Sequence, residues 1–195
     1  MSENESDRAA RFRRLYAGSY RSLAGYARRR TLSAEDAADV VAETFLVAWE
    51  RREAMPSGDK ALPWLFGVAR NVIANQQRGT QRQERIARRL HFELAPVAVE
   101  SPEDAATSVA GEALGRLSEP DRELLRLVAW EGLGPSEIAT VLNCSGGAVR
   151  VRLLRARRRF AHHYGSLSGE PVAEAAIMEV PRVPSCQSGG ELAHG

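Results

Sequence analysis

Cysteine, histidine and aromatic residues are scarce in this 195-residue sequence. Its two cysteines, Cys144 and Cys186, form neither a metal-binding spacing nor a disulfide framework, so a reducing interior is expected. The four histidines do not pair with carboxylates or cysteines at ligand or triad spacing, and no glycine-rich phosphate-binding loop is present. These absences disfavour an enzyme, and we expect no catalytic residue, no metal and no cofactor.

Long apolar runs are also missing. No stretch approaches the length of a transmembrane helix, and residues 1–7 are polar and acidic, unlike a secretory signal peptide. We therefore expect a cytoplasmic protein that does not associate with a membrane. Hydrophobic residues still make up 44% of the chain, which is enough for one ordinary core or two small ones.

The net charge of +2 is small, but the charges are unevenly distributed. Residues 70–89 contain six arginines and one acid, and residues 91–137 contain ten acids and three arginines. Acidic residues are then absent from residues 143–164, which are rich in arginine. Two basic segments on either side of an acidic one predict two separate contacts with a polyanion.

The second basic segment has the pattern of a helix-turn-helix. Its apolar residues recur at helical spacing and form one stripe, which consists of Val149, Leu153, Ala156 and Phe160. A preceding helix is expected from Pro135, ended by Asn143 in the left-handed conformation, and Ser145 is expected to cap the second helix. Arginine-rich faces are often only solvated, but this combination favours binding in the major groove of DNA.

Residues in the N-terminal half of that helix are expected to read base edges. Arg150 is the first candidate for hydrogen bonds, and Val151 and Leu154 are candidates for apolar contacts such as a thymine methyl. The later arginines are expected to meet phosphates; these are Arg155, Arg157, Arg158 and Arg159. The complete predicted DNA-binding set of this module is Ser145, Arg150, Val151, Arg152, Leu154, Arg155 and Arg158.

The N-terminal half predicts three helices after a frayed tail of eight residues. The first spans about residues 9–30, and the second opens at Ser33 with a capping pattern and runs to about Arg52. A loop over residues 55–62 precedes the third helix, in which Pro63 suits the first turn. Within that helix, Trp64 and Phe66 suit a core, whereas interleaved amides and arginines suit single-stranded nucleic acid.

The sequence therefore predicts an all-α protein of two small helical domains on a flexible linker, the C-terminal one a helix-turn-helix. The expected divisions are a first domain at 9–90, a linker at 91–107, a second domain at 108–164 and a disordered tail at 165–195.

Three sequence blocks, in this order and spacing, resemble the extracytoplasmic-function sigma factors. They are Glu43-Thr44-Phe45-Leu46-Val47-Ala48-Trp49, then Pro63-Trp64-Leu65-Phe66-Gly67-Val68-Ala69-Arg70-Asn71, then residues 131–159. The resemblance covers roughly residues 12–160. It implies a bacterial promoter-specificity subunit that binds core RNA polymerase, directs it to promoters and promotes DNA opening. It also implies a domain at 9–90 like sigma region 2 and one at 108–164 like sigma region 4.

The resemblance also implies a place for each contact. The second helix would dock on the clamp of the polymerase's largest subunit, through Asp39, Glu43, Phe45, Leu46, Val47 and Trp49. The loop at 55–62 and the third helix would capture unstacked bases of the minus-ten element, through Met55, Arg70, Asn71, Asn75, Arg78 and Arg82. The helix-turn-helix would read the minus-thirty-five element of the promoter DNA. An anti-sigma factor would be a further partner, although the residues give no direct sign of one.

Two positions depart from the family pattern. Val151 stands where many members have a serine, so their minus-thirty-five sequence cannot be transferred. The capture loop has Met55 and no aromatic residue, which leaves its base preference open.

Two alternatives compete with this interpretation. A stand-alone helix-turn-helix regulator would bind duplex DNA without polymerase and would tolerate deletion of residues 64–82. A nucleic-acid enzyme would need a metal or nucleophile site, and none is found in the sequence.

Overall fold

The computed structural model describes residues 5–90 and 108–169, and it describes the side chains of these residues except at 80–90. This part of the chain is helical and contains no strand, which confirms the all-α prediction. The α-helices are α1 (Glu5–Arg28), α2 (Ala34–Glu50), α3 (Ala61–Leu90), α4 (Val109–Gly115), α5 (Glu119–Ala129), α6 (Pro135–Leu142) and α7 (Gly146–Ser168). Two short 3-10 helices, η1 (Arg52–Ala54) and η2 (Gly58–Lys60), lie between α2 and α3.

Helix α1 begins four residues before the predicted residue 9, so the expected frayed tail is too long. Glu5 and Asp7 occupy its first turn, where acidic side chains are stabilised by the helix dipole. Ion pairs also hold this turn against η1. Arg52 bonds Glu5 at 2.8 Å, and Arg8 bonds Glu53 at 2.6 Å.

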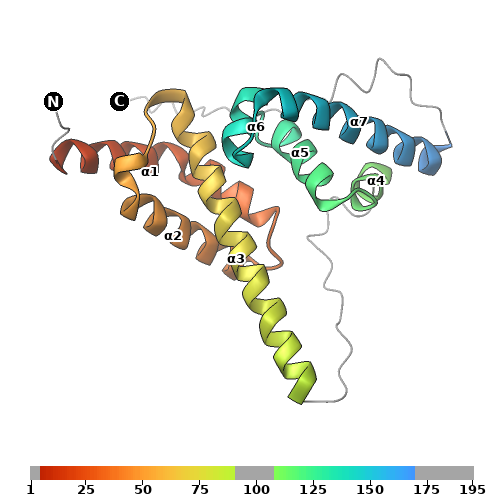
Figure 1. Cartoon of the computed structure of the whole chain (residues 1–195), viewed down its shortest axis with the longest axis horizontal. Coiled ribbons are helices and arrows are strands. Elements are labelled where there is room, and N and C mark those ends of the chain that lie inside the picture. The colour runs from red at the N-terminus through yellow and green to blue at the C-terminus, as the bar shows by residue number, and fades with distance from the viewer. Residues whose placement is uncertain (1–4, 91–107, 170–195) are drawn as a thin grey trace, which may run out of the picture.

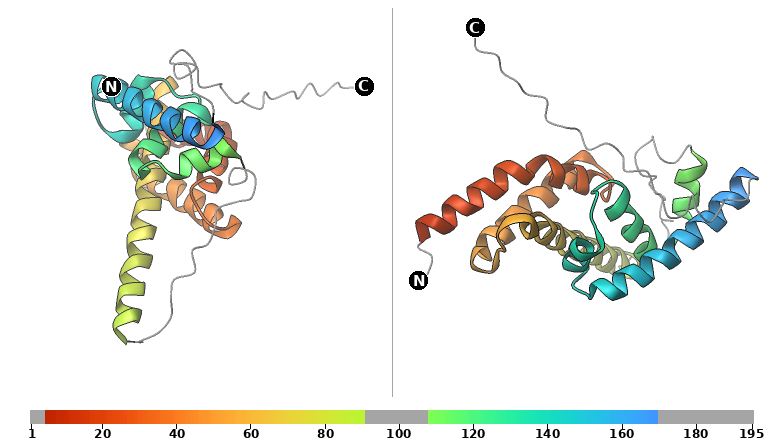
Figure 2. Two further views of the ribbon diagram at one scale, coloured as in Figure 1. Left: turned by 90° about the vertical axis from the view of Figure 1, so that its right-hand side faces the viewer. Right: turned by 90° about the horizontal axis from the view of Figure 1, so that it is seen from above.

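Helices α1, α2 and α3 form the N-terminal module. Ser33 caps α2 as predicted, because its hydroxyl accepts a hydrogen bond from the Asp36 N–H at 2.9 Å. Helix α3 begins at Ala61, which places Pro63 within its first turn. At 30 residues the helix is about 45 Å long. Its C-terminal half extends away from the rest of the molecule (Figures 1 and 2).

Helices α4 to α7 form the C-terminal module, and the predicted signals of the helix-turn-helix are present. Asn143 adopts the left-handed conformation, with φ of 49°, at the end of α6. Ser145 then caps α7 by accepting a hydrogen bond from the Ala148 N–H at 3.2 Å. Ser108 caps α4 in the same way.

Helix α7 is longer than the predicted domain, which was expected to end at residue 164. It runs to Ser168, so residues 165–168 are helical rather than part of a disordered tail. No proline interrupts this segment. The helix ends only where Gly169 takes the left-handed conformation, with φ of 73°, and its N–H bonds the Gly165 carbonyl at 3.0 Å. The predicted linker at 91–107 and the tail from residue 170 lie outside the described residues.

The two modules pack directly against each other. One continuous group of buried apolar side chains includes Leu23, Leu65 and Phe66 of the N-terminal module and Leu127 and Ile138 of the C-terminal module. Helix α3 lies against α6, as two of the views show (Figures 1 and 2). The sequence predicted two modules on a linker but did not predict this contact.

Candidate nucleic-acid and polymerase interfaces

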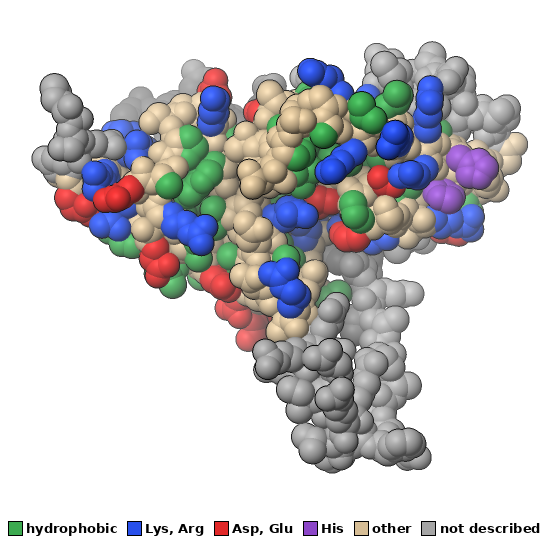
Figure 3. All heavy atoms as spheres, viewed as in Figure 1, with side chains coloured by type: hydrophobic (Ala, Val, Ile, Leu, Met, Phe, Trp, Pro, Cys, Tyr) green, Lys and Arg blue, Asp and Glu red, His purple; other side chains and the backbone are tan. Residues whose placement is uncertain are grey.

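The outer face of α7 is cationic and open to solvent. Its apolar stripe is buried at Val149, Leu153 and Ala156, which turns the remaining positions outward. The predicted DNA-binding residues are all exposed; these are Ser145, Arg150, Val151, Arg152, Leu154, Arg155 and Arg158. Basic side chains gather over α7 on the surface (Figure 3).

Two of these residues add apolar surface to the cationic face. Val151 is 50% exposed and Leu154 is 41% exposed. Together with Arg150 they place a hydrogen-bond donor beside two apolar groups near the start of the helix. A base edge in the major groove offers acceptors and, at thymine, a methyl group.

The last of the predicted phosphate contacts has a partner within the protein. Arg159 forms an ion pair with Asp121 of α5 at 2.5 Å. Arg157 is half-buried rather than exposed. The guanidinium of Arg159 therefore links α7 to α5, while the Arg159 side chain stays 56% exposed.

Five of the six predicted minus-ten residues lie on successive turns of α3. Arg70, Asn71, Asn75 and Arg78 are all exposed. Asn75 accepts a hydrogen bond from the guanidinium of Arg78 at 2.5 Å, which orients its amide. The side chain of the sixth predicted residue, Arg82, lies outside the described part of the chain.

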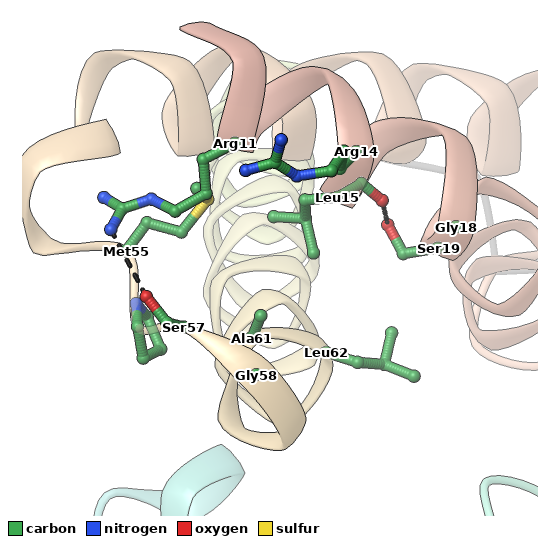
Figure 4. Close-up of a pocket in the computed structure, with 11 residues that line it drawn as sticks. Arg11, Arg14, Leu15, Gly18, Ser19, Met55, Ser57, Gly58, Ala61 and Leu62 are labelled. Carbon is green, nitrogen blue, oxygen red and sulfur yellow. Dashed lines mark hydrogen bonds between the residues drawn. The ribbon is translucent and has the colours of Figure 1, made fainter. Parts of the chain in front are cut away.

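Met55 is only 3% exposed, in contrast to the surface contact expected of it. It lines a pocket of about 370 Å³ between α1 and the loop at 55–62 (Figure 4). Leu15 and Leu62 supply further apolar lining, and Arg11 and Arg14 add guanidinium groups. Arg11 also ties α1 to the loop, since its guanidinium donates to the Ser57 hydroxyl at 3.4 Å and to the Arg52 carbonyl at 2.9 Å. Asn71 and Asn75 are not among the residues that line this pocket.

The predicted polymerase-binding residues of α2 divide into exposed and buried ones. Asp39, Leu46 and Trp49 are exposed, with Leu46 at 58% and Trp49 at 37%, and Glu43 and Val47 are half-buried. Phe45 is 6% exposed and belongs to the core, so it supports this face from beneath.

Aromatic side chains of α1 adjoin this face of α2. The Phe12 ring lies 5.0 Å from that of Trp49, and the Tyr16 ring lies 4.5 Å from that of Phe45. The face therefore combines exposed apolar groups with carboxylates. Acidic side chains gather along the lower left edge of the surface, near α2 (Figure 3).

Four charged residues and a tyrosine form a hydrogen-bonded group between the two modules, and the sequence pattern did not predict it. We call it the intermodule cluster; it consists of Tyr26, Arg29, Arg30, Glu123 and Glu131. Arg30 donates to Glu123 at 2.9 Å and to Glu131 at 3.0 Å. Arg29 donates to Glu131 at 2.6 Å, and the Tyr26 hydroxyl donates to Glu123 at 3.1 Å.

Burial defines the character of this cluster. Tyr26 is fully buried, and the side chains of Arg30 and Glu131 are 6% and 3% exposed. The guanidinium of Arg30 also lies 3.6 Å from the centre of the Tyr26 ring. Burial, and then the carboxylate of Glu123, raises the pKa of Tyr26 well above its usual value, so the phenol stays a hydrogen-bond donor. The only sign of this cluster in the sequence is the four-residue spacing of Tyr26 and Arg30, which is the spacing of neighbours on one helix face.

No group of histidine, cysteine, aspartate and glutamate that could hold a metal ion occurs among the described residues. Within the same residues, no helix has the length and apolar character needed to cross a membrane.

Comparison with known proteins identifies the family to which this arrangement belongs. The model of sigma-70 region 2 matches residues 15–83, and the model of sigma-70 region 4 matches residues 109–160. The ECF RNA polymerase sigma factor SigL of Mycobacterium tuberculosis is 34% identical over 150 residues, which cover 74% of this chain and 84% of that protein. The chain belongs to the extracytoplasmic-function (ECF) RNA polymerase sigma factors.

Solved structures of sigma factors share the fold. One is the sigma factor RpoE in complex with the anti-sigma factor NepR from Bartonella quintana, with a TM-score of 0.59 and 24% identity, covering 78% of this chain and 95% of that one. Another is CnrH in complex with the cytosolic domain of CnrY, with a TM-score of 0.54 and 27% identity, covering 80% and 88%.

As an ECF sigma factor, the chain is a transcription-initiation subunit that acts with core RNA polymerase at promoter DNA. The resemblance seen in the sequence is thereby confirmed. A stand-alone helix-turn-helix regulator is not favoured, because the match includes region 2 as well as region 4. Members of this family are initiation factors rather than enzymes.

Proposed function

We propose that this sigma factor divides promoter recognition between its two modules. Residues 9–90 bind core RNA polymerase and the minus-ten element, and residues 108–164 bind the minus-thirty-five element. Residues 91–107 connect them and, with 17 residues, span at most about 60 Å when extended. The observation that carries the proposal is the exposed cationic face of α7 in a chain whose other basic helix, α3, belongs to a separate module.

In the proposed minus-thirty-five contact, α7 enters the major groove by its N-terminal half. Arg150, Val151 and Leu154 meet base edges there, since they are exposed near the start of the helix. Ser145, Arg152, Arg155 and Arg158 complete the contact, mainly at phosphates. Phosphate contacts supply affinity that falls as salt rises, whereas base contacts supply preference.

In the proposed minus-ten contact, single-stranded bases are held by α3 and by the loop at 55–62. Asn71 and Asn75 offer amides to base edges, and Arg70, Arg78 and Arg82 neutralise the backbone. The pocket lined by Met55 has the size and apolar walls to receive an unstacked base, with Arg11 and Arg14 near its phosphate. Unstacking a base costs a few kcal/mol, and capture of the base offsets that cost.

In the proposed polymerase contact, α2 docks on the clamp of the largest subunit. Leu46 and Trp49 supply exposed apolar surface, and Asp39 and Glu43 supply negative charge. Val47 lies at the edge of this face, and Phe45 holds it in place from the core. An anti-sigma factor is a further proposed partner, since the sigma factor RpoE in one of the solved structures is bound to the anti-sigma factor NepR. The proposal places the protein in the cytoplasm, where the polymerase works, and assigns it no catalytic activity of its own.

The test of the proposed function is reconstituted transcription. Core RNA polymerase from the source bacterium, the purified chain and a library of genomic DNA fragments should together yield run-off transcripts from a small set of sites. Core polymerase alone should not yield them. A chain that does not co-elute with core polymerase, and that adds no transcripts, would show the proposal to be wrong.

Two arginines of α7 should behave differently when each is replaced with alanine. Arg150→Ala is expected to cost about 1–3 kcal/mol at the preferred promoter and to relax its sequence preference, because a base contact is lost. Arg155→Ala is expected to weaken binding to all sequences similarly and to reduce the salt dependence by about one charge. Binding of the polymerase holoenzyme to a panel of single-base promoter variants at several salt concentrations measures both. Equal loss of preference in the two variants would contradict the assignment.

A further inference from the structure

We propose that the N-terminal turns of α1 position the loop at 55–62 for base capture, and that Arg11 is the positioning residue. The inference rests on the base capture proposed above for this loop. It gives α1, which holds none of the predicted minus-ten residues, a task in promoter recognition. The contacts that carry it come from three side chains near the start of α1, which are Glu5, Arg8 and Arg11.

Two ion pairs hold the first turns of α1 against η1. Glu5 accepts from the guanidinium of Arg52 at 2.8 Å, and Arg8 donates to Glu53 at 2.6 Å. The side chains of Glu5 and Glu53 are more than half exposed, so each pair by itself stabilises the contact only weakly. Arg11 lies three residues beyond Arg8, as Arg8 does beyond Glu5, so all three follow one side of the helix. The ion pairs align α1 with η1, and Arg11 makes the contact with the loop itself.

The guanidinium of Arg11 bridges two points on either side of Met55. One of its nitrogens donates to the Arg52 carbonyl at 2.9 Å, and the other donates to the Ser57 hydroxyl at 3.4 Å (Figure 4). The Arg52 carbonyl also accepts a hydrogen bond from the Met55 N–H at 3.4 Å. A guanidinium presents its donors in a rigid planar fork, which the single ammonium of a lysine lacks. Arg11 therefore fixes residues 52 and 57 relative to each other and to α1.

The same side of α1 continues as one wall of the pocket beside the loop. Its residues there recur at the spacing of one helix face; they are Arg11, Arg14, Leu15, Gly18 and Ser19. Met55 and its neighbours in the loop line the pocket from the other side. The shape of this pocket of about 370 Å³ therefore depends on how the loop is held against α1.

A loop that is already held loses less conformational entropy when it captures a base. Residues 55–57 are not helical, so no regular series of backbone hydrogen bonds orders them. The two hydrogen bonds of Arg11 supply part of that order from α1. Without them the loop would still adjoin α1 but would be less fixed, and the ordering cost would be added to the capture of the base.

The first measurement reports the loop in the free, full-length chain. The sequence contains three methionines, and Met55 is 3% exposed. Labelling of the methionine methyl groups with ¹³C therefore gives a simple NMR spectrum, in which the Met55 signal, assigned with Met55→Leu, reports the packing of the loop. In both Arg11→Ala and Arg11→Lys this signal should shift, and the order parameter of the methyl group should fall.

Two other arginines of α1 serve as comparisons. Arg13 is exposed and does not line the pocket, so Arg13→Ala is the matched control for loss of one charge and should leave the Met55 signal in place. Arg14 is also exposed but lines the pocket. Arg14→Ala should leave the Met55 signal in place and should weaken the binding of single strands with a smaller salt dependence, as expected of a phosphate contact.

The second measurement reports base capture by the polymerase holoenzyme. Single strands that cover the minus-ten element of a promoter found by run-off transcription are compared with strands that lack one base at a time. In the parent, one abasic position should cost about tenfold in affinity, because its base is the one held in the pocket. In Arg11→Ala and Arg11→Lys this penalty should shrink about fivefold, since residue and base are coupled through the loop. In Arg13→Ala it should stay at its parental value.

Three outcomes would overturn the inference. One is a Met55 signal that stays in place in folded Arg11 variants. Another is a loss of affinity in Arg11→Ala that Arg11→Lys restores, which would indicate a direct contact of the charge with DNA. The third is an abasic penalty that is unchanged in both variants. Circular dichroism identifies a variant that has unfolded; Ser57→Ala, which removes one end of the bridge at an exposed residue, then decides by the same shift of the Met55 signal.

Failure of this inference is distinguishable from failure of the proposed function. The methyl spectrum needs neither polymerase nor a promoter, so it can contradict the positioning of the loop while run-off transcription succeeds. A chain whose loop responds to the Arg11 variants as expected, and that yields no transcripts with core polymerase, would refute only the function.

Discussion

Replacing Leu46 with glutamate is expected to weaken binding to core RNA polymerase by about 2–4 kcal/mol, which corresponds to about 30- to 1,000-fold in affinity. Leu46 is 58% exposed on the face of α2 proposed to dock on the clamp, next to Trp49. A glutamate there would carry an unpaired charge into an apolar contact. Titration of dye-labelled sigma factor with core polymerase, followed by fluorescence anisotropy, measures the loss.

Leu32 provides a matched control for this substitution. It is also 58% exposed, but it lies in the turn between α1 and α2 and not on the proposed docking face. Leu32→Glu should leave the affinity for core polymerase unchanged, and both variants should unfold at the temperature of the parent. Equal losses in the two variants would indicate a general effect of added charge, and no loss in Leu46→Glu would place the docking face elsewhere.

Replacing Phe66 with alanine is expected to lower the free energy of unfolding by about 3–5 kcal/mol. Phe66 is 1% exposed, and its ring stacks on that of Tyr26 at 4.9 Å and 21°. The substitution would leave a cavity where α3 meets α1, close to the intermodule cluster. Urea denaturation followed by circular dichroism measures the change.

Tyr20 is a suitable comparison for Phe66. It is 49% exposed on α1, and its ring lies 6.4 Å from that of Phe45, so Tyr20→Ala should cost less than about 1 kcal/mol. A small loss for Phe66→Ala would mean that the core at this point collapses around the deleted ring. A large loss for Tyr20→Ala would mean that the exposed aromatic face contributes to folding as well as to docking.

Helix boundaries with a local chemical cause were predictable. Ser33 and Ser145 each cap the helix that follows, and Asn143 takes the left-handed conformation that ends α6. These features depend on hydrogen bonds between residues a few positions apart. The early start of α1 involves a distant residue, since Glu5 in its first turn bonds Arg52, 47 positions away.

In the candidate DNA-binding site, the exposure of the residues on α7 was predictable from the spacing of the apolar residues of that helix. The spacing of Val149, Leu153 and Ala156 already implied that Arg150, Val151 and Leu154 point outward, and they are exposed. The burial of Met55 was not predictable from the sequence, because it results from the packing of the loop against α1. Phe45 is adjacent to the exposed Leu46 in the sequence, whereas in the structure its ring lies in the core beneath the face of α2.

The sequence by itself determined the helices, the helix-turn-helix, the distribution of charge and the family, because each follows from short-range periodicity, capping and motif order. Only the tertiary structure decided how the two modules meet. Arg30 and Glu123 are 93 positions apart, and Arg29 and Glu131 are 102 apart. Pairing over such separations depends on the packing of α3 against α6, and no local pattern among arginines and glutamates distinguishes a buried partner from a solvated one.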